Sequence, residues 1–428
     1  MQIMPNTGPE PRDALRRRIP FLVGTGFFAL LALLYLSGAT SVYRGILEAW
    51  GVDPFAYPFL DTDTVLSAIR CLRAGVDVFA VNPCDPLGRV YDYSPLWLVL
   101  RHFPVTLAWL SPVGLAVDSA FLLSLLLLPV GRDRTATGRI VLGMLASSVV
   151  YAVERGNNDL VLFALAAVAA TLACHSQKLR LVGYAAALLA GLLKYYPMTL
   201  LLIVTRERPA RFFAVATASV ALVILFVATM GHELVRALQL IPTGPYLSAM
   251  FGSSTLPSGL GELLGWPAMV SGALRLLLSL GALTIAWVIG TRGWFEADIA
   301  ALSERERNFL LVGALLVLSC FFTAQNIGYR ATHLLLALPT LTALCRIGSR
   351  PRLYGWTTGA VLGVLWPQCW RQALDGTTSL THWSLSDVRI AGWMLREVMW
   401  WWAITMLIAC VVALLRGSEM GRWVRRAA

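Results

Sequence analysis

The sequence predicts an all-α protein that crosses a membrane several times. Of its 428 residues, 57% are hydrophobic and 14% are charged, and the mean hydropathy is +0.67. Soluble domains carry about 25% charged residues. Apolar stretches recur from residue 20 to residue 415, and about 20 helical residues cross a hydrocarbon core of roughly 30 Å. A helical bundle is favoured over a barrel, because barrel strands would alternate polar and apolar residues.

The first apolar stretch follows the arginines at 16–18, as the core of a signal peptide would. It is too long for that role and lacks a cleavage site of small residues, so we expect a retained span. About twelve spans are predicted in all. They lie at residues 19–39, 111–130, 139–153, 158–175, 181–193, 195–205, 212–230, 272–290, 309–324, 332–345, 353–368 and 398–415.

The distribution of arginine and lysine predicts the topology. Most of these residues fall in segments that are cytoplasmic if the chain begins in the cytoplasm, so the positive-inside rule places both termini there. The basic clusters form no single basic face, so we expect membrane lipids and no nucleic acid as partners. The excess of arginine over lysine and the abundance of alanine are typical of a GC-rich bacterial genome. We therefore expect the bacterial plasma (inner) membrane.

We expect a single domain over residues 1–428 with three long extracytoplasmic segments. These segments lie at 40–110, 231–271 and 369–397. The first and third are rich in Trp, Tyr and Pro, which is typical of helices that lie on the membrane face. The cysteines show no metal-ligand spacing, but Cys71, Cys84 and Cys369 lie in the outer segments and could form a disulfide.

Two aspartates begin a short apolar helix in the first outer segment, "DTDTVLSAIRCLRAG" at 61–75. Leu66 and Ile69 repeat at helical spacing, and Gly75 is a natural terminator. We expect Asp63 to cap the helix or to contact a ligand. The N-terminus of a helix also keeps a carboxylate ionised, as a general base requires. D-x-D can alternatively hold a divalent metal, although three residues are a weak signal for it.

Six polar or glycine residues, "ERGNND" at 154–159, interrupt two apolar segments. A tight turn accounts for the glycine and the asparagines, and either Asn158 or Asp159 could cap the next helix. Glu154 and Arg155 could pair with each other or reach into a cavity. The predicted topology places this turn on the outer side.

Aromatic residues and cations lie at other outer ends of spans. Tyr91 and Tyr93, in "VYDYSPLWL", belong to an interfacial aromatic belt or stack on a sugar ring. Lys194, in "GLLKYYPMTLLLI", either snorkels to the interface or binds a phosphate. Arg330 and His333 share one helix face because they are three residues apart. Arg330 is a second candidate for phosphate or a topogenic arginine.

In this order the motifs resemble a known family. An Asp-headed helix closed by "RAGVDVF" is followed by "YDYSPLWL", "RGNNDLVLF" and "GLLKYYPMTLLL" over residues 61–202. This order is similar to that of the polyprenyl-phosphate-mannose-dependent mannosyltransferases of glycosyltransferase family 87. The resemblance implies the GT-C fold, a bundle of membrane helices with extracytoplasmic loop helices.

The resemblance also implies a reaction. Mannose, or a related pentose or hexose, would move from a polyprenyl-phosphate sugar to a lipid-linked or cell-envelope glycan acceptor, with inversion and without a metal or other cofactor. The family's catalytic aspartate lies fourteen residues before the glycine that ends the helix, which is Asp61 in this chain.

A general base and cations suit this reaction, because the acceptor hydroxyl loses a proton while the phosphate departs. We expect Asp61 to be the base. The expected phosphate ligands are Lys194, Arg330, Arg155 and His333, and the expected sugar or acceptor contacts are Asp63, Tyr91, Tyr93, Glu154, Asn157, Asn158 and Tyr195.

Two other classes of protein stay open. Twelve spans with cytoplasmic termini are also typical of a secondary transporter of a polar or lipid-linked substrate. Transporters place polar sites near the bilayer midplane, whereas the polar motifs here lie at the outer ends of spans. That difference and the long first outer segment favour an enzyme. The third class is a non-catalytic scaffold or flippase partner.

Overall fold

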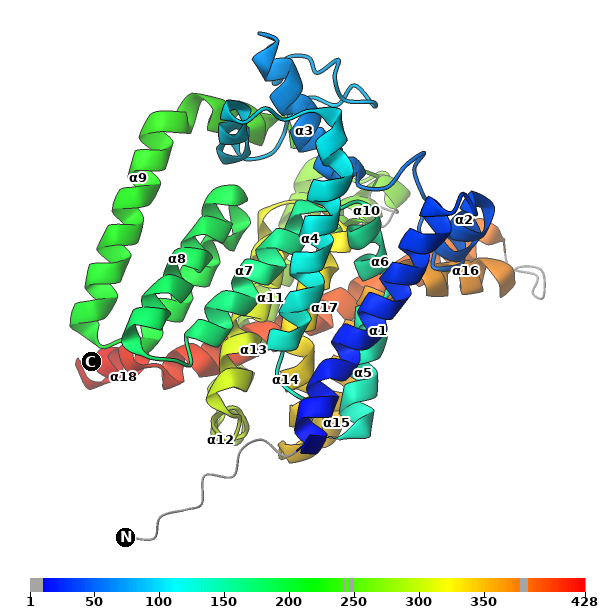
Figure 1. The fold of residues 1–428 in the computed structure, drawn as a ribbon. Coiled ribbons are helices and arrows are strands. Elements are labelled where there is room, and N and C mark those ends of the chain that lie inside the picture. The colour runs from blue at the N-terminus through cyan, green and yellow to red at the C-terminus, as the bar shows by residue number, and fades with distance from the viewer. Residues whose placement is uncertain (1–10, 132, 242, 246–249, 378–383, 428) are drawn as a thin grey trace.

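The computed structural model describes residues 11–131, 133–241, 243–245, 250–377 and 384–427. As predicted, these residues are mostly helical (Figure 1). The α-helices are α1 (Pro11–Leu36), α2 (Thr40–Ala49), α3 (Leu60–Arg73), α4 (Leu110–Ser124), α5 (Arg134–Met144), α6 (Ser147–Glu154), α7 (Asn158–Leu172), α8 (Gln177–Leu193), α9 (Pro209–Gln239), α10 (Thr255–Leu264), α11 (Ala268–Gly290), α12 (Gly293–Ala300), α13 (Glu304–Thr323), α14 (Leu334–Ile347), α15 (Pro351–Leu365), α16 (Pro367–Thr377), α17 (Leu385–Gly417) and α18 (Glu419–Ala427). The 3-10 helices are η1 (Pro95–His102), η2 (Leu107–Trp109), η3 (Leu125–Leu127), η4 (Tyr196–Arg206) and η5 (Gly328–His333), and strands β1 (Met250–Phe251) and β2 (Asn326–Ile327) pair antiparallel.

Six helical segments of the described chain are long and apolar enough to cross a membrane. They are α1, α4 with its flanking 3-10 turns, α9, α11, α13 and α17, and the bent pair α5 and α6 could form a seventh span. The predicted number of about twelve is not confirmed. Helices α7, α14 and α15 have 15, 14 and 15 residues, fewer than the roughly 20 that a span needs. Their apolar residues pack against other helices, and every residue from Leu334 to Leu344 of α14 is buried.

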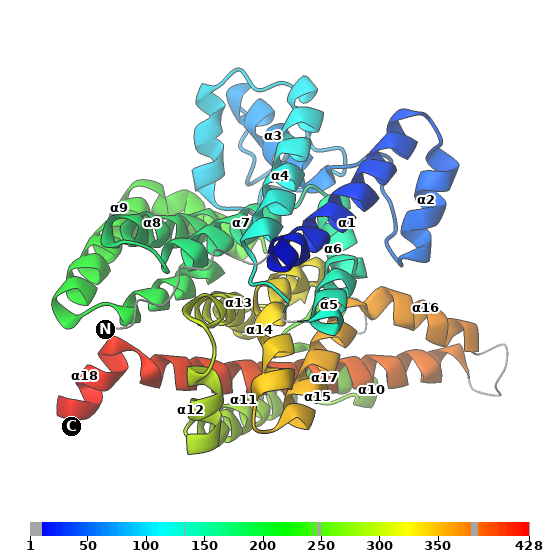
Figure 2. The same ribbon diagram turned by 60° about the horizontal axis from the view of Figure 1, so that its bottom comes forward.

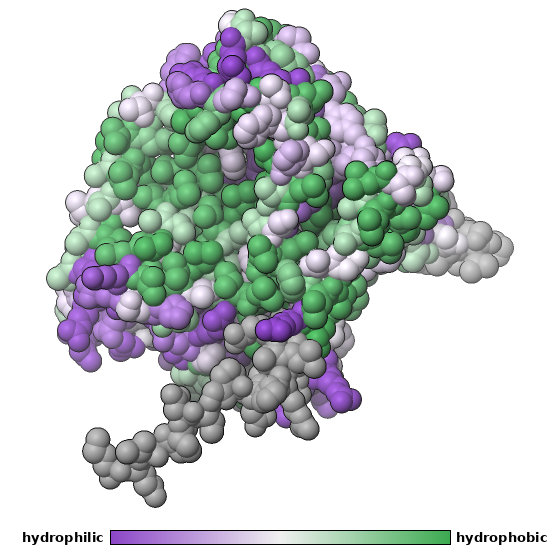
Figure 3. Space-filling model, in the orientation of Figure 1, coloured by the Kyte–Doolittle hydropathy of each residue, from purple (hydrophilic) through white to green (hydrophobic). Residues whose placement is uncertain are grey.

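The apolar helices divide into a core and an outer layer. Only 11% of the most apolar 18-residue stretch is buried in α9 and in α11, whereas 78% of that stretch is buried in α13. Helix α13 packs against α14, and α17 crosses the bundle in contact with α11, α13 and α15 (Figure 2). On the face shown in Figure 3, an apolar band separates polar residues at the two ends of the molecule. This distribution is that of a membrane protein, because lipid covers exposed apolar surface that water would not.

The first predicted outer segment folds as helices at one end of the bundle, with α3 at the top of Figure 1. Helix α3 and η1 share a small apolar cluster of their own, built around Val65, Ile69 and Leu98. A disulfide joins Cys71 of α3 to Cys84, with 5.8 Å between the Cα atoms. Cys369 is a free cysteine, so the outer disulfide that the sequence allowed is Cys71–Cys84.

The span helices α9 and α17 extend further into the two later outer segments than predicted. Helix α9 continues to Gln239, past the expected boundary at 231, and α17 begins at Leu385, before the expected boundary at 398. Both helices extend beyond their most apolar parts, with 31 and 33 residues. Hydropathy marks only the part that would lie in lipid, so it misses these extensions. Residues 242, 246–249 and 378–383 of the predicted segments lie outside the described residues.

The disulfide predicts a measurable contribution to stability. Its two cysteines are 13 residues apart, and a cross-link that closes a loop of this size stabilises a fold by about 3 kcal/mol. The double variant Cys71→Ala, Cys84→Ala should therefore unfold at a lower temperature in detergent. Cys369→Ala is the matched control and should unfold like the wild type. Equal midpoints for the double variant and the wild type would contradict the prediction.

Candidate active site

The end of α6 fixes the start of α3. The last carbonyl groups of a helix lack intrahelical partners, and so do the first N–H groups of the next one. Here the carbonyl groups at the end of α6 accept hydrogen bonds from backbone N–H groups, and from one side chain, at the start of α3. The bonds run from Phe59 N to the Glu154 carbonyl (2.8 Å), from Asp61 N to the Arg155 carbonyl (3.0 Å) and from Thr62 Oγ1 to the Gly156 carbonyl (2.7 Å).

The predicted tight turn between α6 and α7 is confirmed, and it requires its glycine. Gly156 has φ +54°, a region that side chains disfavour. A Cβ atom there would lie 2.6 Å from Thr62 Oγ1 and 3.0 Å from a ring carbon of Phe59. Any larger residue would therefore push α3 away from α6.

The predicted helix caps are wrong in detail. Asn157 caps α7, because its Oδ1 accepts a hydrogen bond from the Asp159 backbone N–H at 2.8 Å, so neither Asn158 nor Asp159 is the cap. Helix α3 begins at Leu60, before both aspartates, and no side chain caps it. Asp63 therefore lies inside the first turn. The Arg155 carbonyl takes the place of a capping side chain at this helix.

The two aspartates of α3 face different partners. Asp61 is 6% exposed; its Oδ2 accepts a hydrogen bond from Asn157 Nδ2 at 2.6 Å, and Arg89 lies 3.5 Å from its Oδ1. Asp63 accepts a hydrogen bond from the Tyr57 hydroxyl at 2.7 Å, with Arg70 at 3.8 Å. This difference in partners does not resemble a shared metal site. Among the described residues, no three His, Cys, Asp or Glu side chains lie close enough to hold a metal ion.

Asp159 is the centre of a buried charged cluster. Its Oδ2 lies 2.9 Å from Lys194 Nζ and 3.4 Å from Arg330 Nε. Its Oδ1 accepts a hydrogen bond of 2.5 Å from the Tyr196 hydroxyl, and His333 Nε2 lies 2.7 Å from the same hydroxyl. The side chain of Lys194 is only 12% exposed, so it does not snorkel to the interface.

Two cations, those of Lys194 and Arg330, share the carboxylate of Asp159. Asp92 lies near both cations; burial raises the pKa of Asp92, and the two cations act in the opposite direction. Among the described residues, Asp159 is the only carboxylate within ion-pair distance of the two cations. A phosphate is the kind of anion that two such neighbouring cations bind.

Asn157 joins Asp61 to this cluster. Its amide donates to the Asp61 carboxylate, and its amide oxygen holds the backbone N–H of Asp159. A further cation, Arg89, lies beside Asp61 and forms an ion pair with Asp85 at 2.9 Å. Burial is the largest single effect and opposes the charge of Arg89, but the hydrogen bond to Asp85 and the charges of Asp85 and Asp61 together outweigh burial and raise the pKa of the guanidinium. A carboxylate and a cation pair are therefore held at a fixed spacing by one short turn.

Other expected residues have different surroundings. Arg155 pairs with Glu154 at 3.2 Å and lies over the rings of Tyr151 and Phe55, so no close contact joins it to the Asp159 cluster. Glu154 lines a largely apolar cavity of about 260 Å³ that is bordered by α1, α2, α4 and α6. The roles of Glu154 and Arg155 at a phosphate or a sugar stay predictions.

The residues expected to contact a sugar lie in different surroundings. Tyr91 is completely buried in the apolar cluster of α3, and its hydroxyl donates to the Ser94 carbonyl at 2.8 Å. Tyr93 lies beside the charged cluster, because Lys194 Nζ is 5.6 Å from its ring centre. Asn158 is buried, and its Nδ2 has no hydrogen-bond partner among the described residues. Tyr195 precedes η4 and is half-buried beside Lys194.

Sequence reasoning missed three residues of the site: Asp159 as an ion-pair partner, Tyr196 and Arg89. Asp159 and Tyr196 stand directly beside predicted site residues in the motifs "RGNND" and "KYYP". A charged residue at the start of an apolar helix could have indicated Asp159. Arg89 lies in a loop, and no local pattern distinguishes it from other arginines. Comparisons with protein-family models, curated proteins and solved structures found no match for this chain.

The charged cluster predicts a large effect of one neutral substitution. Asp159→Asn would leave Lys194 and Arg330 buried without their shared carboxylate, and removing one partner of a buried ion pair costs about 3–5 kcal/mol. We expect a lower midpoint of thermal unfolding in detergent. The control is Asp53→Asn, an exposed aspartate of the same outer segment as Asp61. A variant as stable as the wild type would contradict the ion-pair account.

Proposed function

We propose that the protein is a membrane glycosyltransferase. It would move mannose, or a related pentose or hexose, from a polyprenyl-phosphate sugar to a lipid-linked or cell-envelope glycan. The proposal rests on one observation: a buried carboxylate, Asp61, is tied through Asn157 to a cation pair that shares a single carboxylate. This is the arrangement that transfer away from a phosphate needs, because the base and the leaving-group ligands must act at opposite ends of one reaction.

In the proposed step, the acceptor hydroxyl attacks the anomeric carbon of the donor. The new C–O bond forms as the bond to the phosphate oxygen breaks, and the sugar inverts. Asp61 takes the hydroxyl proton as general base. The departing phosphate keeps the bonding electron pair, and Lys194 and Arg330 stabilise its charge. Asn157 and Arg89 orient the Asp61 carboxylate for this step.

The disulfide supports an extracytoplasmic site. Cys71 and Cys84 belong to the layer that contains Asp61, and disulfides persist mainly outside the reducing cytosol. A site on that face of the bacterial inner membrane would meet a polyprenyl-phosphate sugar, since its soluble nucleotide-linked counterparts stay in the cytoplasm. This placement agrees with the topology that the positive-inside rule predicts.

The first test removes the base. Asp61→Asn keeps the size of the side chain but cannot take the proton, so transfer should fall by at least about 100-fold, the lower end of what a general base contributes. The measurement is the movement of label from a radiolabelled polyprenyl-phosphate mannose to another lipid or glycan, in proteoliposomes made with native membrane lipids. Donor binding should be retained, and Asp53→Asn should transfer like the wild type.

Two results would contradict this proposal. Full transfer by Asp61→Asn would remove Asp61 as the base. Donor that crosses the membrane of the proteoliposomes unchanged, with no transfer by the wild type, would favour the transporter.

The second test removes a phosphate ligand. Lys194→Met keeps the apolar stem of the side chain but removes the ammonium group, so the affinity for the donor lipid should fall by about tenfold or more. The chain has only one other lysine, Lys178, which is exposed. Lys178→Met is the matched control and should bind like the wild type. Unchanged donor affinity in Lys194→Met would leave Lys194 with a purely structural role.

A further inference from the structure

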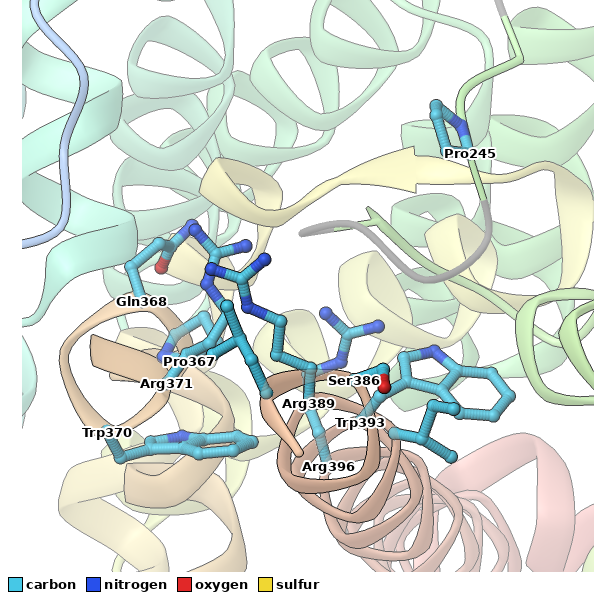
Figure 4. Close-up of a pocket in the computed structure, with 11 residues that line it drawn as sticks. Pro245, Pro367, Gln368, Trp370, Arg371, Ser386, Arg389, Trp393 and Arg396 are labelled. Atoms are coloured by element: carbon cyan, nitrogen blue, oxygen red, sulfur yellow. The ribbon is translucent and has the colours of Figure 1, made fainter. Parts of the chain in front are cut away.

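A second polar cavity lies outside the site described above. It has a volume of about 670 Å³ and is bordered by α16 and the first turns of α17. Figure 4 shows that the guanidinium groups of Arg371, from α16, and of Arg389 and Arg396, from α17, gather in this cavity. Its size is that of a pocket for a small molecule or for part of a lipid.

The polar side chains that line this cavity are almost all hydrogen-bond donors. They are Arg371, Arg389, Arg396, Gln368, Ser386 and Trp393. No aspartate or glutamate is among the described lining residues, although Asp375 and Glu397 pair with Arg389 and Arg396 from outside the lining. Gln368 uses its Oε1 to accept a bond from Ser147 at 2.9 Å, so its amide N–H groups remain for the cavity. A lining of donors and positive charge favours an anion that is rich in acceptor oxygens.

One of these donors is buried without a partner. Trp393 is 4% exposed, and its indole N–H has no acceptor in the described part of the chain. A buried donor without a partner costs free energy, and a ligand oxygen atom would satisfy it. The Arg371 side chain is exposed and forms no hydrogen bond or close ion pair among the described residues, although its charge acts on Asp375. Asp375 itself forms a bidentate pair with Arg389 (3.1 and 2.9 Å), so the guanidinium of Arg371 is accessible to a ligand.

The cavity borders the candidate active site. Pro245 lines the cavity. The backbone N–H of the adjacent Gly244 donates a hydrogen bond to Gln325 Oε1 at 2.9 Å, and the Gly244 carbonyl accepts one from Gln325 Nε2 at 3.0 Å. Gln325 precedes β2, whose Asn326 accepts a hydrogen bond from Arg330 of the charged cluster. One short stretch of chain therefore contacts both the cavity and the cation pair.

The rest of the lining is apolar. Trp370 lies beside the guanidinium groups, and Pro367, the first residue of α16, and Ile390 of α17 also line the cavity. An inorganic anion would use only the arginines, whereas a lipid phosphate would use the arginines and the apolar walls together.

We propose that this cavity binds the phosphate of an anionic lipid, and that this lipid carries the acceptor. Arg371 binds the phosphate oxygens through its planar fork, Trp393 donates its indole N–H, and the apolar walls contact the lipid chain. The identification of the lipid as the acceptor rests on the proposed transferase function. The proposed binding of an anionic lipid does not depend on the transferase function.

The test measures binding of short-chain lipids to the purified protein by native mass spectrometry. Dioctanoyl phosphatidic acid should bind, and dioctanoyl phosphatidylcholine should bind at least about tenfold more weakly. Arg371→Ala should weaken phosphatidic acid binding by about tenfold or more, and Trp393→Phe by a smaller factor, because it keeps the ring and loses only the N–H. Arg371→Lys, which keeps the charge but loses the fork, should fall between the wild type and Arg371→Ala.

Three controls separate the alternatives. Arg352→Ala removes an exposed arginine of α15 and should leave binding unchanged, and Lys194→Met should do the same if the two anion sites are distinct. Excess inorganic phosphate should compete poorly. Equal binding by Arg371→Ala and the wild type would overturn the proposal, as would phosphatidylcholine binding as tight as that of phosphatidic acid. Full competition by inorganic phosphate would reduce the cavity to a site for free anions.

The binding assay and the transfer assay fail independently. Lipid binding that depends on Arg371, in a protein that transfers no sugar, would support the cavity and contradict the proposed transferase. Sugar transfer by a protein whose lipid binding does not depend on Arg371 would support the proposed transferase and contradict the proposed lipid site. If both proposals are correct, Arg371→Ala should raise the KM for the acceptor lipid and leave donor affinity unchanged.

Discussion

The short turn between α6 and α7 is the constraint on which the site depends. Its carbonyl groups hold the start of α3, its Asn157 side chain holds the Asp61 carboxylate, and its Asp159 holds Lys194 and Arg330. Three segments that are distant in sequence therefore meet at six consecutive residues, 154–159. Gly156 makes this possible, because a side chain at that position would collide with Thr62 and Phe59. The turn sets the spacing between Asp61, the proposed base, and the cations.

Asp159 explains how the cations stay buried before a substrate binds. A buried charge without a partner is costly, so Lys194 and Arg330 need an anion at all times. Asp159 is the carboxylate that both cations contact directly, and Asp92 lies near them. Under the proposed function, the phosphate of the donor would bind beside the same two cations, and departure of the product would leave them with Asp159 again. Tyr196 and His333 fix the carboxylate in place from its other oxygen.

The helical membrane fold was predictable because it follows from composition, while the number of spans was not. Hydropathy does not separate a helix that faces lipid from one such as α14 that is buried by other helices, since both are apolar. Within the site, the sequence motifs singled out Asp61 and Lys194, and a position at the outer end of a span singled out Arg330 and His333. The structure brings the last three together around Asp159. The pairing of Arg89 with Asp61 and the shared role of Asp159 depend on tertiary contacts between distant segments, which no local pattern records. The cap of α3 was mistaken for the same reason, because the Arg155 carbonyl replaces a side chain.

The most direct measurement is a cryo-electron microscopy structure with a non-hydrolysable phosphonate analogue of a polyprenyl-phosphate mannose. We expect phosphonate oxygens at hydrogen-bond distance, about 3 Å, from Lys194 and Arg330. Asp61 should face the anomeric carbon from the side opposite the phosphonate, with room between them for an acceptor hydroxyl. A phosphonate bound among Arg371, Arg389 and Arg396, or a sugar remote from Asp61, would contradict the account.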